Sequence, residues 1–179
     1  MYFAALLART EDGWEASDTE LDDVETLSDL TDLAREASDE DTVLVLIEQE
    51  DAWFGVVRVD GEEDPRIYVS DAAAAARSSY GEILLTDELL GRDPEDLEDL
   101  VDLDGTEDGD TSDDDPEADA GLMDDPVPVG PLGDADILTD LGLSRKALLA
   151  LSGDGALTGE ALGEIADAIG CADVLEAVR

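Results

Sequence analysis

The run TVLVLIEQEDAWFGVVRVDGEEDPRIYV, residues 42–69, decides the fold of this chain. It contains three stretches rich in β-branched and aromatic residues, at 42–49, 52–59 and 66–69. Such residues favour β-strands, and Asp60-Gly61 is typical of a hairpin turn. The connections ED and DGEEDP are too short for a crossover between parallel strands. The run therefore predicts consecutive antiparallel strands.

Further predicted elements flank these strands. Residues 2–9 form an apolar, strand-like run, and the turn TEDG leads to a short partner strand at 14–17. Residues 26–38 place leucines at helical spacing on one face, which predicts an amphipathic helix. With a closing helix at 70–85, the order β-β-α-β-β-β-α predicts an α+β domain over residues 1–85. Its sheet is mainly antiparallel and five-stranded, with helices covering it.

The predicted closing helix, SDAAAAARSSYGEILL at 70–85, is smooth and nearly neutral in a strongly acidic chain. Its first residues supply an N-cap. Alanine is the best helix former and lets a helix approach a sheet closely, so residues 72–76 are interpreted as packing residues. Arg77, Ser78 and Tyr80 follow the smooth part, where they face a partner or pair with nearby acids.

Charge divides the chain into three segments. The whole chain carries 51 acids against 9 bases, a formal net charge of −42. Residues 1–85 hold 23 acids and 5 bases, residues 86–130 hold 19 acids and one base, and residues 131–179 hold 9 acids and 3 bases. The middle segment is predicted to be an acidic, largely disordered linker. The last is predicted to be a small all-helical segment that packs weakly on itself, or docks on the first domain or on a partner.

Composition also excludes several kinds of catalytic site. The chain has no histidine and one cysteine, Cys171. Histidine catalysis, histidine or thiolate zinc sites and an internal disulfide are therefore ruled out. No glycine-rich phosphate loop occurs, and the many carboxylates single out no acid–base pair. The sequence predicts no catalytic, cofactor-binding or metal-binding residues, and a protein that is not an enzyme.

One stretch in the acidic segment is a partial match to a calcium loop. In DGTEDGDTSDDD, residues 104–115, Asp104 and Asp108 fit the EF-hand frame. Thr106 and Pro116 depart from it. A solvated linker is the favoured interpretation, and calcium binding is kept as an alternative.

The net charge also limits the kinds of partner. So acidic a chain repels phosphate backbones and anionic membranes, and it contains no basic stripe. We therefore expect a protein partner, no direct nucleic acid and no membrane. The N-terminus lacks the basic region of a signal peptide, and a lone cysteine agrees with a reducing compartment, which predicts a cytoplasmic protein.

Five residues are the candidates for binding a partner: Arg66, Arg77, Ser78, Tyr80 and Trp53. Aromatic and arginine side chains are frequent hot spots of protein interfaces. Trp53 and Phe54 are neighbours on a strand, so they point to opposite faces of the sheet. The alternative for both is that helices cover them.

The run AWFGVVRVDGEEDPRIYVSDAAAAARSSYGEILL, residues 52–85, resembles the tRNA adenosine deaminase-associated protein family of actinobacteria. The opening YFAALLARTEDGW and the tail DILTDLGLS…ADAIG fit the same family. The resemblance implies an association with the tRNA-editing deaminase, as a gene neighbour or as a physical partner, and supplies no catalytic residues. A zinc deaminase needs H-x-E and P-C-x-x-C, which this chain lacks, so it is not the deaminase itself.

Three functional hypotheses follow. The first is a non-enzymatic accessory or regulatory protein whose partner is the tRNA adenosine deaminase. The second is an acidic mimic of nucleic acid that binds basic proteins. The third is a small-ligand sensor or an enzyme, with a pocket between the sheet and the alanine helix.

Overall fold

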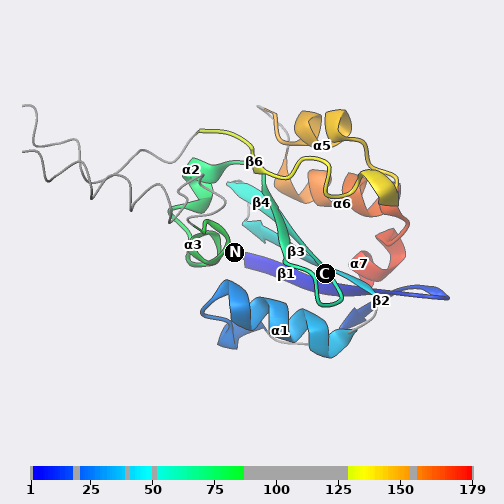
Figure 1. The fold of residues 1–179 in the computed structure, drawn as a ribbon. Coiled ribbons are helices and arrows are strands. Elements are labelled where there is room, and N and C mark those ends of the chain that lie inside the picture. The colour runs from blue at the N-terminus through cyan, green and yellow to red at the C-terminus, as the bar shows by residue number, and fades with distance from the viewer. Residues whose placement is uncertain are drawn as a thin grey trace, which may run out of the picture.

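The computed structural model describes residues 2–17, 21–38, 41–49, 52–86, 129–153 and 157–178. These residues form one antiparallel sheet with helices on both faces (Figure 1). In spatial order the strands are β2 (Gly13–Ser17), β1 (Tyr2–Thr10), β3 (Thr42–Gln49), β4 (Trp53–Asp60), β5 (Arg66–Val69) and β6 (Leu132–Gly133).

The central strands are apolar almost throughout because both faces of the sheet are covered. Side chains alternate between the faces of a strand. In β3, Leu44 and Leu46 therefore enter one core, whereas Val43 and Val45 enter the other. The register places Val45 opposite Val57, which belongs to the same core. The sheet thus separates two hydrophobic cores.

The first helical layer comes from two parts of the chain, one after β2 and one after β5. It consists of η1 (Leu21–Asp23), α1 (Leu27–Ala37), α2 (Ala72–Ala75) and α3 (Ser79–Leu84). A capping box starts α1: the Thr26 hydroxyl accepts the Asp29 N–H at 3.2 Å, and the Asp29 carboxylate accepts the Thr26 N–H at 3.1 Å. Leu30 and Ala34 of α1 then enter the core of this face. The helix is positioned by its cap and its apolar stripe together.

The second layer comes from the C-terminal part of the chain (Figure 1). It consists of η4 (Thr139–Leu141), α5 (Arg145–Leu151), α6 (Thr158–Ile169) and α7 (Ala172–Val178). Leu162 and Ile165 of α6 share a buried core with Leu44 and Phe54 of the sheet. Of the arrangements expected for residues 131–179, the structure therefore shows docking on the sheet.

The predicted α+β class and antiparallel pairing are confirmed. The sheet has a sixth strand, β6, which lies in the segment predicted to be all-helical and which the sequence did not indicate. The prediction of one helix over 70–85 is wrong, because α2 and α3 are separate. Ser78 caps α3, with its Oγ accepting the Gly81 N–H at 3.4 Å. Gly81 lies so close to α2 that an added Cβ would be 2.7 Å from the Cα of Ala75.

The predicted acidic linker and the calcium-loop alternative at 104–115 fall mainly on residues outside those that the structure describes. The division into segments 1–85, 86–130 and 131–179 stays a prediction.

Among the described helices, none combines the length and the apolar character that crossing a membrane requires.

Candidate binding groove at the sheet edge

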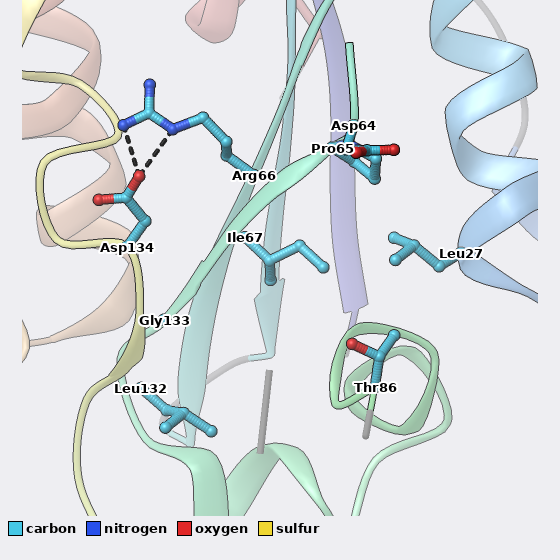
Figure 2. Close-up of a pocket in the computed structure, with 9 residues that line it drawn as sticks. All are labelled: Leu27, Asp64, Pro65, Arg66, Ile67, Thr86, Leu132, Gly133 and Asp134. Atoms are coloured by element: carbon cyan, nitrogen blue, oxygen red, sulfur yellow. Dashed lines mark hydrogen bonds and ion pairs between the residues drawn. The ribbon is translucent and has the colours of Figure 1, made fainter. Parts of the chain in front are cut away.

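A groove opens where β5 and β6 form one edge of the sheet and α1 lies alongside (Figure 2). Its volume is about 650 Å³. The lining residues are Leu27, Asp64, Pro65, Arg66, Ile67, Thr86, Leu132, Gly133 and Asp134. Four separate parts of the chain thus build one site: the start of α1, the turn and strand at 64–67, Thr86 just after α3, and the segment around β6.

The floor of the groove is apolar. Ile67 is only 5% exposed and belongs to the core on the α1 face. Leu27 and Leu132 are half-buried and pack against the same core. Figure 2 shows Ile67 in the middle of the groove, with its side chain directed toward Leu27. The groove is therefore an opening onto the core, floored by aliphatic side chains.

The rim is acidic, and Arg35 of α1 fixes its position. The Arg35 guanidinium donates to the carbonyl of Gly61 at 3.1 Å and to the carbonyls of Glu62 and Glu63 at 3.3 Å. These bonds hold the backbone of the turn between β4 and β5 against α1. The side chains of Glu62, Glu63 and Asp64 are exposed. The turn consequently presents carboxylates to solvent from a fixed backbone.

An ion pair closes the opposite side of the groove. Arg66 Nε donates to Asp134 Oδ2 at 2.6 Å, and the Arg66 Nη2 group contacts the same oxygen (Figure 2). The backbone N–H of Asp134 also donates to the Ile67 carbonyl at 2.9 Å. The pair therefore ties β5 to the chain after β6, and the Arg66 charge is matched within the protein.

Gly133 is required where β6 passes β5. Its φ is +105°, a left-handed region that favours glycine. An added Cβ would also lie 3.1 Å from the Cα of Tyr68 and closer still to the Ile67 carbonyl. The close approach of these backbones shapes the floor of the groove.

The structure separates the five sequence-predicted residues. Arg66 lies at the groove, paired with Asp134. Arg77 is exposed after α2. Ser78 is 2% exposed, because it caps α3 and accepts a hydrogen bond from the Tyr2 hydroxyl at 3.2 Å.

The two aromatic candidates differ in exposure. Tyr80 is half-buried and meets Tyr2 edge to face, with ring centroids 5.2 Å apart. Trp53 is 0% exposed, and its indole N–H donates to Gln49 Oε1 at 2.8 Å. Trp53 is therefore a core residue in this structure and offers no surface to a partner. Trp53 and Phe54 do lie in opposite cores, as their adjacency predicted.

Sequence reasoning missed a buried arginine network on the other face. Arg58 is 7% exposed. Its guanidinium donates to Asp140 at 2.5 and 2.8 Å, to the Ile137 carbonyl at 2.8 Å and to Asp60 at 3.1 Å. The hydrogen bond from Arg58 lowers the pKa of Asp140 below its ordinary value. This network joins β4, an interior strand, to the C-terminal layer that covers this face of the sheet. In the sequence, its only signal is an arginine within an otherwise apolar strand.

Among the described residues, no group of three histidine, cysteine, aspartate or glutamate side chains is arranged to hold a metal ion. Cys171 is buried, and burial raises the pKa of its thiol to about 11. A thiol with a raised pKa is a poor nucleophile and a poor metal ligand at neutral pH.

Fold, charge and groove together define a small, strongly acidic α+β protein with a preformed surface site. The chain belongs to the family of Rv3753c-like tRNA adenosine deaminase-associated proteins, whose family model matches residues 2–172. The match runs from β1 to the start of α7 and confirms the family resemblance seen in the sequence. No curated protein and no solved structure gives a significant match.

Proposed function

We propose that this chain is a non-enzymatic accessory protein that binds the tRNA adenosine deaminase. The match to the deaminase-associated family over residues 2–172 carries the proposal. The family is described as associated with a deaminase, and the absence of histidine excludes the zinc deaminase chemistry itself.

Electrostatics supports a direct protein contact. An enzyme that holds tRNA needs a basic surface to neutralise phosphates. A chain with a net charge of −42 is attracted to such a surface over long range. The accessory protein would then compete with tRNA or restrain its access. In this proposal the protein works in the cytoplasm, and the buried free thiol of Cys171 is compatible with that reducing compartment.

Binding is tested by pulling down purified deaminase with the full chain at about 0.05 M and about 0.5 M salt. We expect capture at low salt, weakened but retained at high salt, and release when tRNA is added. If the chain fails to capture the deaminase at either salt concentration, the proposal is wrong.

A second candidate is an acidic mimic of nucleic acid that sequesters basic proteins in general. The run DTSDDDPEAD at 110–119 favours it, because six of its ten residues are acidic and none is basic. The discriminating variant keeps the chain length and converts the acids of this run to Asn and Gln. Mimicry would be favoured over a specific partner by two results together. The variant would no longer capture the deaminase, and the wild type would capture unrelated basic proteins as well as it captures the deaminase.

A further inference from the structure

We infer that the groove at the β5–β6 edge is the docking site for an apolar side chain flanked by lysine or arginine residues on the deaminase partner. The inference rests on the proposed function and specifies which surface of this chain makes the contact and which chemistry it recognises.

The size and the floor of the groove favour an apolar occupant. Its volume of about 650 Å³ falls in the range of about 300–1,000 Å³ typical of ligand sites. Leu27 and Leu132 are half-buried above the nearly buried Ile67, so each still exposes part of an aliphatic surface. Covering that surface with an apolar side chain removes it from water, which drives binding.

The negative charge of the rim favours lysine or arginine residues beside that apolar side chain on the partner. On one side, the turn between β4 and β5 carries the exposed carboxylates of Glu62, Glu63 and Asp64, of which Asp64 lines the groove itself. The two arginines near them are already engaged: Arg35 with three backbone carbonyls and Arg66 with Asp134. Arg35 keeps its positive charge in these bonds, but the three rim carboxylates outnumber it, so the rim carries a net negative charge. Opposite charges across an interface speed association and exclude wrong partners.

The site is also preorganised for binding. Arg35 holds the rim turn against α1, and the Asp134–Ile67 hydrogen bond holds the β6 segment against β5. Fixing these backbones in advance lowers the conformational entropy that binding would otherwise cost. An apolar centre within a polar rim is the usual arrangement of an interface hot spot.

The test measures binding of the purified deaminase to the full chain by titration calorimetry at a fixed, near-physiological salt concentration. Two variants change the groove: Asp64→Lys reverses a charge on the rim, and Leu27→Ala removes most of an aliphatic side chain from the floor. Glu164→Lys is the matched control, because Glu164 is exposed on α6, in the layer on the opposite face, and the change in net charge is the same.

We expect the Kd of Glu164→Lys to stay within about twofold of the wild type, while Asp64→Lys weakens binding about tenfold or more. Leu27→Ala should weaken binding about fivefold. Asp64 is exposed, so its substitution leaves the fold intact, and circular dichroism verifies this for each variant.

Four outcomes would overturn the inference. Equal binding by Asp64→Lys and Glu164→Lys would show that only net charge matters, and would leave the proposed function standing. Tighter binding by Leu27→Ala would show that another part of this chain fills the groove. A wild-type dimer in sedimentation that Leu27→Ala abolishes would assign the groove to a second copy. Failure of the wild type to bind the deaminase would overturn both the inference and the proposed function.

Discussion

Replacing Gly81 with alanine tests how closely α3 packs against α2. An added Cβ at Gly81 would lie 2.7 Å from the Cα of Ala75 and closer still to the Ala75 carbonyl, well inside van der Waals contact distance. The three nearest atoms all belong to the backbone of Ala75, so no side-chain rotation can relieve the clash with them. Overpacking costs about 1–3 kcal/mol, and a rigid obstacle places this case near about 3 kcal/mol.

The gain in helix propensity partly offsets that cost. Alanine is favoured over glycine in a helix by about 1 kcal/mol, so we expect Gly81→Ala to lower the free energy of unfolding by about 2 kcal/mol. Gly163 in α6 is the matched control, because an added Cβ there meets nothing within 4 Å. Gly163→Ala is expected to raise the free energy of unfolding by about 1 kcal/mol.

Urea unfolding followed by tryptophan fluorescence measures both effects, since Trp53 is fully buried and reports on the core. With a slope of about 2 kcal/mol per molar urea, the midpoint should fall by about 1 M for Gly81→Ala and rise by about 0.5 M for Gly163→Ala. A Gly81→Ala midpoint at or above that of the wild type would refute the reasoning. It would mean that α2 and α3 can separate at no cost.

Three further predictions concern the charged and buried groups. Arg58→Met should cost about 2 kcal/mol, because it leaves the buried Ile137 carbonyl without its donor and removes the cation that pairs with Asp60 and Asp140. Arg66→Met, at a half-exposed pair, should cost less than about 1 kcal/mol, and the urea midpoints of the two variants compare them. Because the native state lowers the pKa of Asp140 below 3.8, its stabilising effect is complete above that pH and is lost as pH falls through the lowered value. The difference in stability between wild type and Asp140→Asn, followed by thermal unfolding, should therefore shrink below about pH 4, and a constant difference would contradict the linkage. Cys171 should resist a thiol-specific reagent at pH 8 in the native protein and react within seconds in denaturant, because burial raises its pKa to about 11; rapid native labelling would contradict its placement.

The strands could be predicted from the sequence because local propensity and tertiary burial agree there. The range 66–69 is the observed β5, and the run 42–49 is the observed β3. β6 could not be predicted in this way. It has two residues, and it exists because backbone groups after residue 130 bond to β5, which no local pattern encodes.

The break between α2 and α3 was missed for a related reason. Helix propensity favours a continuous helix through the alanines. The close contact between Gly81 and Ala75 arises from tertiary packing, which propensity does not describe. Ser78 is the N-cap of α3, a role that the sequence alone did not indicate. Propensity alone therefore predicts one helix where packing requires two.

The groove was only partly visible in the sequence. Arg66 was predicted as a binding residue from its charge, but its ion-pair partner lies 68 residues away in sequence. Asp64 and Arg35 were not singled out, because in so acidic a chain one more carboxylate carries little information. The groove is identified by an acidic turn that precedes a buried strand and is held by an arginine on a helix. That combination can be recognised only when the three-dimensional positions of these residues are known.

The covering of the second sheet face by the C-terminal helices has a consequence for synthesis on the ribosome. The strands through Val69 are complete long before α6 and α7 are made, and the face bearing Leu44 and Phe54 lacks its cover until then. Translation proceeds at about 5–20 residues per second, so this apolar face waits on the order of 5–20 s for its partners. During that interval the nascent chain is open to aggregation, and the carboxylates of the acidic run synthesised in between supply the charge repulsion that opposes it.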